Sequence, residues 1–378
     1  MRLRHKACLV IMLAAVGVSA QNLSEVRVGL RTQSSQHIVR VHDFDYVLVY
    51  LDGSVDTLRA DALTLTPVGT QLDVKTVDGG RPADSIHVMD SDVFTAQIGR
   101  YIARHYSGKM VCRAYRRKVQ SILVTPRTEY LMGVIHAELG YLEHPELWKA
   151  QAVVANTWFQ RNHGKFKKQG FQVTDDVRSQ VFHGLPNDST RLADLRAAVS
   201  QVESHIIVDS LHPSDGPIEA LFHANSGGQT MDCGWYFGPR PYLVSFTDEF
   251  SLDCKQTSWT KRLTAGQWTD YLARQLGQSS SDSAFVHWAT HLPLGSRSEY
   301  LIYDGHKVRL RQVREDYQLR STWFATRSDG DLVVLEGRGY GHGIGMSQEG
   351  AHRMAMLGFS FEEILEFYYP HTLIVPLD

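Results

Sequence analysis

The chain has 378 residues, of which 43% are hydrophobic and 21% are charged, a composition that indicates a globular protein and excludes a disordered chain. Its 39 Lys and Arg residues nearly balance its 41 Asp and Glu residues. The overall charge therefore indicates neither a nucleic acid nor an anionic membrane as a partner.

The N-terminal segment, residues 1–20, has the pattern of a secretory signal peptide. Three of the first six residues are basic, the apolar run Cys8–Val18 follows, and Ser19 and Ala20 place small residues at the expected cleavage site. The run is too short to span a bilayer comfortably; the alternatives are a membrane anchor and a buried helix. We expect an exported protein of the periplasm or cell envelope, with no transmembrane segment after signal cleavage.

Three cysteines remain after this cleavage. Cys233 and Cys254 flank a turn rich in Pro and Gly, and each follows an Asp. Because an oxidising compartment allows a pair of cysteines to bond, we expect a disulfide between these two. Cys112 lies in an alternating strand pattern and is expected to be a buried, unreactive thiol.

Residues 21–126 are predicted to form a β-rich N-terminal region. Val26–Leu30 and Val47–Tyr50 are rich in β-branched and other apolar residues, and Ser107–Lys109 has the composition of a turn between two strands. The strand pattern stops at Pro126.

Apolar residues recur at helical spacing from Arg127, with Thr128 as the expected N-terminal cap, and a second helix is predicted to begin near Pro145. Further helices are predicted over residues 190–203, 265–276, 347–357 and 360–368, and strands around 206–208 and 219–223. These elements predict an α+β protein in which residues 127–378 contain a helical central region packed with β-rich segments.

Glu138 is the first candidate for chemistry. It lies near the end of the first predicted helix, which is largely apolar, and Gly140 marks the helix end. A carboxyl group at such a position can be desolvated, which favours its protonated form and lets it donate a proton at neutral pH. The alternative is a solvated Glu at a helix end, which is the commoner situation.

A second candidate segment runs over residues 222–230. A strand is predicted to bring His223 into a turn where Gly227 and Gly228 let backbone N–H groups approach a ligand, and where Ser226 adds a donor for sugar hydroxyls. A tight hairpin with a solvated His is the alternative.

A third segment, residues 337–345, contains five glycines and leads into a helix expected near Ser347. A helix N-terminus beside such a loop can bind an anion or a polar group. The segment lacks the Lys-Ser/Thr ending of a phosphate-binding loop, which argues against a nucleotide. His342 within it is open to three interpretations: a core histidine, a catalytic group or a substrate ligand.

The sequence predicts no metal and no cofactor. It has 18 histidines, but H-E-x-x-H and C-x-x-C spacings are absent, so a metal site is poorly supported. The G-x-S-x-G motif of many serine hydrolases is absent as well.

Together these segments resemble the family of stage II sporulation protein D and the amidase-enhancer proteins. The resemblance spans about residues 25–375. Its motifs lie at 129–138, 146–155, 180–184, 223–228, 337–351 and 361–370.

This resemblance implies a lytic transglycosylase that cuts peptidoglycan glycan strands lacking stem peptides, with Glu138 as the catalytic acid and base. One carboxyl group would act twice and leave a 1,6-anhydro end on N-acetylmuramic acid. The residues expected to line or flank the substrate groove are His223, Ser226, Gly227, Gly228, His342 and Gln348.

Two departures from the family pattern affect which residue roles can be transferred from the family to this chain. Asn156 stands where relatives often have Arg, and Ser179 and Phe182 replace a Cys and a Tyr of a loop that binds metal in some relatives. Two rival functions remain open: a non-catalytic protein that binds the cell wall and activates a partner amidase, and a metal-dependent envelope hydrolase.

Overall fold

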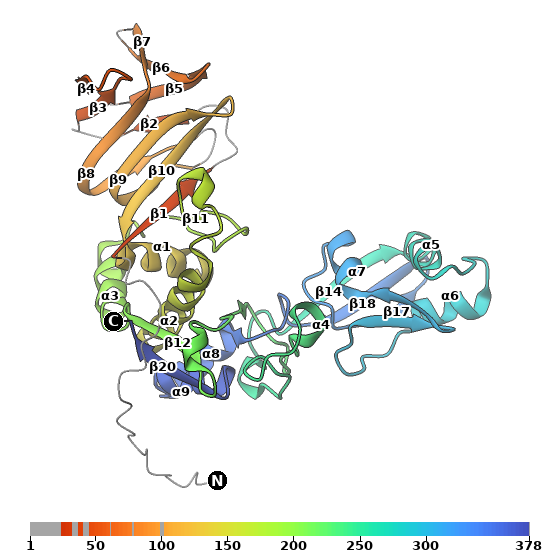
Figure 1. Cartoon of the computed structure of the whole chain (residues 1–378). Coiled ribbons are helices and arrows are strands. Elements are labelled where there is room, and N and C mark those ends of the chain that lie inside the picture. The colour runs from red at the N-terminus through yellow and green to blue at the C-terminus, as the bar shows by residue number, and fades with distance from the viewer. Residues whose placement is uncertain are drawn as a thin grey trace.

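The computed structural model describes residues 24–31, 37–40, 45–60, 62–77, 79–98 and 102–377. The predicted signal peptide, residues 1–20, lies outside these residues. Figure 1 shows a body with a β-rich part at one end and helices in the middle, and an arm that extends to one side.

The β-rich part contains two antiparallel sheets packed on each other. Its strands are β1 (Glu25–Leu30), β2 (His37–Arg40), β3 (Asp45–Val49), β4 (Val55–Arg59), β5 (Ala62–Val68), β6 (Gln71–Thr76), β7 (Gly79–Ala83), β8 (Ser85–Ala96), β9 (Arg104–Tyr115) and β10 (Lys118–Pro126). The short strand β11 (Val173–Thr174) joins the larger sheet in parallel with β1. The strand orders are β11-β1-β10-β9-β8-β3-β4 and β2-β5-β6-β7.

The helical centre follows directly on β10. Its helices are α1 (Arg127–Leu139), α2 (Pro145–Asn162) and α3 (Ser189–Val199), and α8 (Gln348–Met356) and α9 (Phe361–Tyr368) pack on α2 from the C-terminal part of the chain. The paired strands β12 (His205–Asp209) and β20 (Thr372–Pro376) lie at its edge. One hydrophobic core runs from the two sheets through these helices. The centre of the body therefore combines segments that are far apart in sequence.

The remaining short elements are three 3₁₀ turns, the helix α4 (Gly234–Phe237), and the parallel strand pair β13 (Phe222–His223) and β19 (Met346–Ser347). The 3₁₀ turns are Lys167–Gln169, which lies beside the β9–β10 hairpin, Pro213–Asp215 and Glu249–Ser251.

The arm has a core of its own, which includes Trp268, Leu272, Phe285 and Val313. It contains α5 (Ala265–Leu276), α6 (Ser283–Thr290), α7 (Leu310–Asp316), the hairpin of β15 (Tyr300–Tyr303) and β16 (His306–Arg309), and the sheet β14-β18-β17. The strands of that sheet are β14 (Ser258–Thr264), β17 (Phe324–Asp329) and β18 (Leu332–Arg338).

The predicted α+β class is confirmed, and the helix predicted over residues 265–276 has those bounds in α5. The predicted cap at Thr128 is wrong, because α1 begins after Pro126 without a side-chain cap and the Thr128 hydroxyl instead donates to Glu203. Within the described residues, no helix has the length and apolar character needed to cross a membrane.

The predicted turn at Ser107–Lys109 is also wrong. These residues lie inside β9, where the pairing with β8 is irregular. Gly108 has φ +101, and a Cβ there would lie 3.0 Å from Cα of Thr125 on β10, so the glycine serves a close strand contact and not a chain reversal. The actual turn between β9 and β10 is Arg116–Arg117.

The predicted disulfide between Cys233 and Cys254 is not formed in the structure, where both residues are free thiols. The Cys233 thiol contacts the carbonyl of Gly238, whereas the Cys254 thiol faces the carbonyl of Phe250. Cys112 is fully buried, as expected, and burial raises its pKa to about 12.

Candidate active site

Glu138 lies in the last turn of α1. The helix buries its apolar residues, including Leu131, Val134 and Ile135, against the body, while the Glu138 side chain remains partly exposed. Gly140 follows with φ +56, a conformation that favours glycine and ends the helix. The sequence thus places the carboxyl group at the edge of a buried helix.

A second segment, residues 180–184, closes over this end of the helix. Phe182 packs directly on Gly133, where a Cβ would overlap the aromatic ring. The Tyr130 hydroxyl donates to Gln180 Oε1 at 3.0 Å. These contacts place the backbone N–H of Val181 3.0 Å from Oε1 of Glu138, to which it donates.

The surroundings of Glu138 favour the protonated acid. Burial raises the pKa of the Glu138 carboxyl, and the hydrogen bond from the Val181 N–H opposes this only in part. In the part of the chain that the structure describes, Oε2 of Glu138 has no hydrogen-bond donor and neither oxygen pairs with a cation. The group can therefore hold a proton at a higher pH than an ordinary Glu and offer it to a ligand.

A second carboxylate, Glu349, links the residues that follow α1 to two of the predicted motifs. Glu349 lies in the motif 337–351, and one of its donors lies in the motif 223–228. Its side chain is only 4% exposed. The Tyr141 hydroxyl donates to its Oε1 at 2.6 Å, and Asn225 Nδ2 and the Gln256 N–H donate to its Oε2 at 2.8 and 2.9 Å. Tyr141 is three residues beyond Glu138, so this network ties the end of α1 to the start of α8.

A pocket of about 290 Å³ opens beside this network. Its lining includes Tyr141, Lys255, Glu349, His352 and Arg353. The Lys255 ammonium lies 4.6 Å from the centre of the Tyr141 ring. An aromatic ring flanked by cations and hydrogen-bonding groups is suited to a polar, anionic saccharide.

The residues predicted to bind substrate in the segment 222–230 mostly make contacts within the protein instead. Ser226 is fully buried, and its hydroxyl donates to Asp248 Oδ2 at 2.7 Å. Gly227 has φ +74, and a Cβ there would lie 2.6 Å from the Gly339 nitrogen; a Cβ on Gly228 would lie 2.9 Å from Leu252. These residues therefore bring two loops into close contact and present no free donors to a sugar.

His223 and His342 lie together, with ring centres 5.6 Å apart. His223 Nδ1 lies 3.1 Å from the Ile344 carbonyl, which can only accept, so Nδ1 carries the hydrogen. Burial lowers the pKa of His223 well below its usual value and that of His342 to about 4, so both rings are neutral at pH 7. Nε2 of His223 is a buried acceptor with no partner among the described residues.

Two further residues singled out in the sequence lie on or against α2. Gln348 is buried at the start of α8, where its Nε2 is 3.4 Å from Gln151 Oε1. Asn156 donates through Nδ2 to the carbonyls of Glu203 and His205, both at 2.9 Å, and so joins α2 to β12. Asn156 thus makes a buried structural contact.

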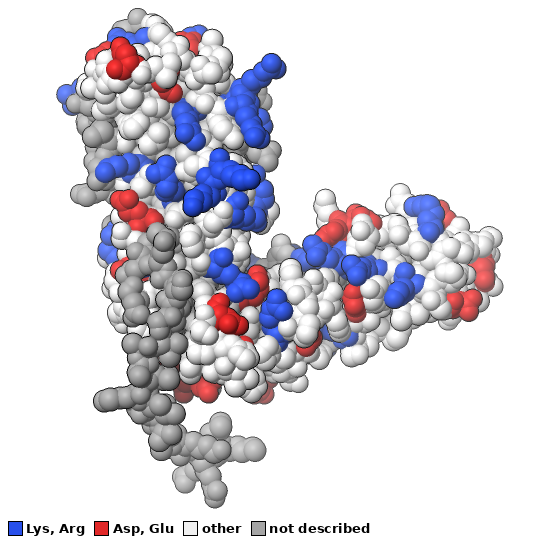
Figure 2. Space-filling model, viewed as in Figure 1, with Lys and Arg blue, Asp and Glu red and all other residues white. Residues whose placement is uncertain are grey.

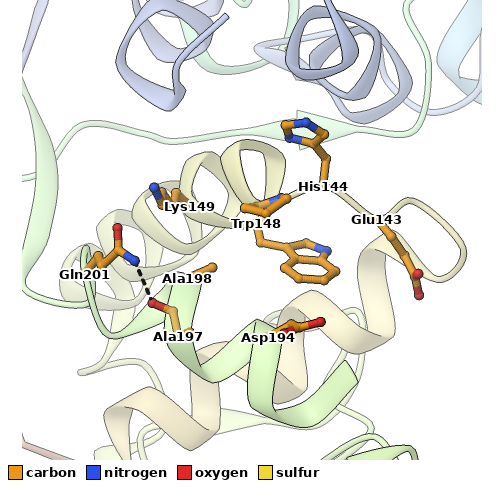
Figure 3. A pocket seen from close by; sticks show the side chains of 9 residues that line it. Glu143, His144, Trp148, Lys149, Asp194, Ala197, Ala198 and Gln201 are labelled. Carbon is orange, nitrogen blue, oxygen red and sulfur yellow. Dashed lines mark hydrogen bonds between the residues drawn. The ribbon is translucent and has the colours of Figure 1, made fainter. Parts of the chain in front are cut away.

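A larger pocket, of about 470 Å³, lies elsewhere on the helical centre, between α3 and the start of α2. Figure 3 shows Trp148 beside it, with Glu143 and Asp194 at one side and Lys149 at the other. None of the residues predicted for the active site lines this pocket.

No group of three or more His, Cys, Asp or Glu among the described residues is placed to hold a metal ion.

The sequence interpretation missed Tyr141, Glu349 and the Val181 N–H. Glu349 follows Gln348 directly and stands inside a recognised motif, which was the available signal. Its role depends on contacts with residues 93 to 208 positions away in the chain, and such contacts are not readable from local pattern.

Comparison with known proteins finds relatives of one family. Residues 115–208, which include Glu138, match the family described as SpoIID, stage II sporulation protein. The stage II sporulation protein D of Bacillus subtilis (strain 168) is 30% identical over 277 residues, covering 70% of this chain and 78% of that protein. That of Bacillus amyloliquefaciens is 28% identical over 268 residues, covering 68% and 76%.

A third relative is the amidase enhancer of Bacillus subtilis (strain 168), which is 27% identical over 297 residues, covering 65% of this chain and 40% of that protein. The chain belongs to the stage II sporulation protein D family.

Proposed function

We propose that the protein is an exported peptidoglycan lytic transglycosylase in which Glu138 is the only acid and base. The observation that carries this proposal is the setting of Glu138: a carboxyl group at the end of a buried helix, with a raised pKa and one oxygen to which no group in the described part of the chain donates. Membership of the stage II sporulation protein D family supports the choice of a cell-wall glycan as substrate.

In the proposed reaction the Glu138 carboxyl acts twice. It first gives its proton to the glycosidic oxygen while the bond from that oxygen to C1 of N-acetylmuramic acid breaks. The resulting carboxylate then takes the proton of the C6 hydroxyl as O6 bonds to C1 and closes the 1,6-anhydro ring. This step restores the protonated Glu138, so the reaction requires neither water nor a second carboxylate.

The surrounding groups would support this cycle. The Val181 N–H stabilises the carboxylate form without suppressing the acid form, because its hydrogen bond only partly opposes the effect of burial. Glu349 is held by three donors and is proposed to position the loop that carries Tyr141. Tyr141, Lys255 and Arg353 would contact the glycan in the adjoining pocket.

A second candidate function is a non-catalytic cell-wall protein that activates a partner amidase. The similarity to the amidase enhancer favours it, as does the burial of Ser226 and Gly227, which removes two of the expected sugar contacts. In that case Glu138 would be a structural residue, and the purified protein would release no sugar.

The test is mass spectrometry of the products released from peptidoglycan, intact and amidase-treated, by wild-type protein and by Glu138→Gln. Glu362→Gln, an exposed site on α9, is the control for the same change of charge. We expect 1,6-anhydro ends from wild type and control, and a loss of about 10² to 10⁴ in rate for Glu138→Gln. Equal products from all three would refute the role of Glu138, and no products from any would favour the amidase-activating function.

A further inference from the structure

One face of the β-rich part is strongly basic although the whole chain is nearly neutral. Residues 93–128 contain eight Lys and Arg and no Asp or Glu, and residues 147–174 contain five and none. Figure 2 shows Lys and Arg gathered over the part of the molecule formed by β9, β10 and the segment before β11, with few acidic residues among them.

The fold brings these two stretches together. Arg113 on β9 donates from Nη2 to the Gln169 carbonyl at 3.2 Å, and Gln120 on β10 donates to the same carbonyl at 3.1 Å. Arg27 on β1 donates from Nε to the neighbouring Gly170 carbonyl at 2.9 Å. The tip of the β9–β10 hairpin and the 3₁₀ turn at Lys167–Gln169 therefore belong to one surface.

We call this surface the basic face; its cations are Arg113, Arg116, Arg117, Lys118, Lys167 and Lys168. All of them except the half-buried Arg113 are exposed. No Asp or Glu oxygen of the described chain lies within 4.0 Å of their charged nitrogens. Six cations held side by side without carboxylates repel one another, so the arrangement favours binding of an anion.

The hairpin tip is built at a conformational cost. Arg116 and Arg117 form the whole two-residue turn between Tyr115 and Lys118, with φ +50 and +60. Such turns strongly prefer Asn-Gly, because positive φ crowds a side chain at both positions. Two arginines at these positions make the turn less favourable than Asn-Gly would, and they put two positive charges at the tip of the hairpin.

We propose that the basic face binds the carboxylates of peptidoglycan. These are the lactyl carboxylates that become free where stems have been removed, as on the strand that Glu138 is proposed to cut, and the carboxylates of peptide stems on neighbouring strands. This inference rests on the proposed function for the identity of the strand. The chain leads from the face to the site: β11 follows the 3₁₀ turn and pairs with β1, and seven residues later the Val181 N–H donates to Glu138. A strand held along the face would thus be retained near the acid.

The surface fits a carboxylate-bearing polymer better than a membrane. No large apolar side chain is exposed among residues 103–120 or 161–172, so nothing on the described face would insert among lipids. Arg113 and Arg116 lie 6.0 and 5.3 Å from the centre of the Tyr115 ring, which adds an aromatic surface beside the cations.

The experiment measures co-sedimentation with sacculi stripped of phosphate polymers, using the full chain carrying Glu138→Gln so that cleavage is not needed. Arg116→Asn with Arg117→Gly removes two charges and leaves a turn that folds at least as well. Lys167→Gln with Lys168→Gln tests the other half of the face. Arg262→Gln with Lys307→Gln, two exposed cations of the arm, is the matched control.

We expect each face variant to bind about tenfold more weakly at low salt while the control binds normally. Protein with an unaltered basic face should bind sacculi whose carboxyl groups have been converted to amides about as weakly as the face variants bind ordinary sacculi. Normal binding by both face variants, or full binding to amidated sacculi, would overturn the inference. So would tighter binding to vesicles containing anionic phospholipid than to sacculi. These outcomes are independent of whether anhydro products form, which tests the proposed function itself.

Discussion

Replacing Gly133 by Ala tests how α1 presents Glu138. The added Cβ would overlap Phe182 and lie 3.1 Å from the Gly184 carbonyl. Phe182 is 2% exposed and packed between Tyr106 and Tyr130, with ring centres 6.1 and 5.7 Å away, so its ring has no open space to enter. The segment over α1 must therefore move outward.

We expect this movement to cost about 1–3 kcal/mol of unfolding free energy, the usual cost of overpacking a core. It also draws the Val181 N–H away from Glu138. Because that hydrogen bond favours the carboxylate, its loss raises the pKa of Glu138 further and misplaces the acid. A displacement of about 1 Å near a catalytic group can cost 10²-fold in rate, so cleavage should fall by a factor of about 10 to 100.

Urea unfolding and the initial rate of anhydro-product release measure the two effects. Gly266→Ala in α5 is the control, because a Cβ at that position meets nothing within 4 Å and alanine favours a helix. Gly133→Ala with the stability and rate of wild type would refute the assigned contact between Phe182 and α1.

Three further predictions follow from contacts at the site and at the basic face. Tyr141→Phe removes a donor from the buried Glu349 carboxylate and should lower the unfolding free energy by about 1–2 kcal/mol, measured by urea unfolding; an unchanged midpoint would contradict the network. Because burial raises the pKa of Glu138 in the folded state, the stability associated with its protonated form is present below its unfolded pKa and is lost as pH rises through the folded pKa. Glu138→Gln should therefore raise the melting temperature at pH 7 but not at pH 4, and a gain of equal size at both would refute the raised pKa. Arg116→Asn with Arg117→Gly should stabilise the protein by about 1–2 kcal/mol, because it relieves two side chains at positive φ; a loss of stability would show that the arginines support the turn.

Much of the fold could be predicted from local sequence. The period of apolar residues after Arg127 and the Pro145 signal located α1 and α2, because helix periodicity and N-terminal Pro act over a few residues. The prediction of a turn at Ser107–Lys109 was wrong because Gly108 is needed for a close contact with Thr125 on another strand and not for a chain reversal. The Arg116–Arg117 turn carries no usual turn residue and gave no local signal.

The candidate site was predictable to a smaller extent. Glu138 was selected by its position on a helix and by family resemblance, and its catalytic role stays a prediction. Ser226 and Gly227 were expected to meet substrate, but the structure commits them to Asp248 and to Gly339, partners 22 and 112 residues away. Net charge concealed the basic face, since a sum over 378 residues says nothing of where the charges lie.

The most direct test of the proposed reaction is cleavage of peptidoglycan in water enriched with ¹⁸O, followed by mass spectrometry of the muramic acid ends. We expect 1,6-anhydro ends with no ¹⁸O, because O6 of the sugar itself bonds to C1 and no solvent oxygen enters. Reducing ends that carry one ¹⁸O would contradict it, since they would show that water attacks C1 and that Glu138 does not use the C6 hydroxyl.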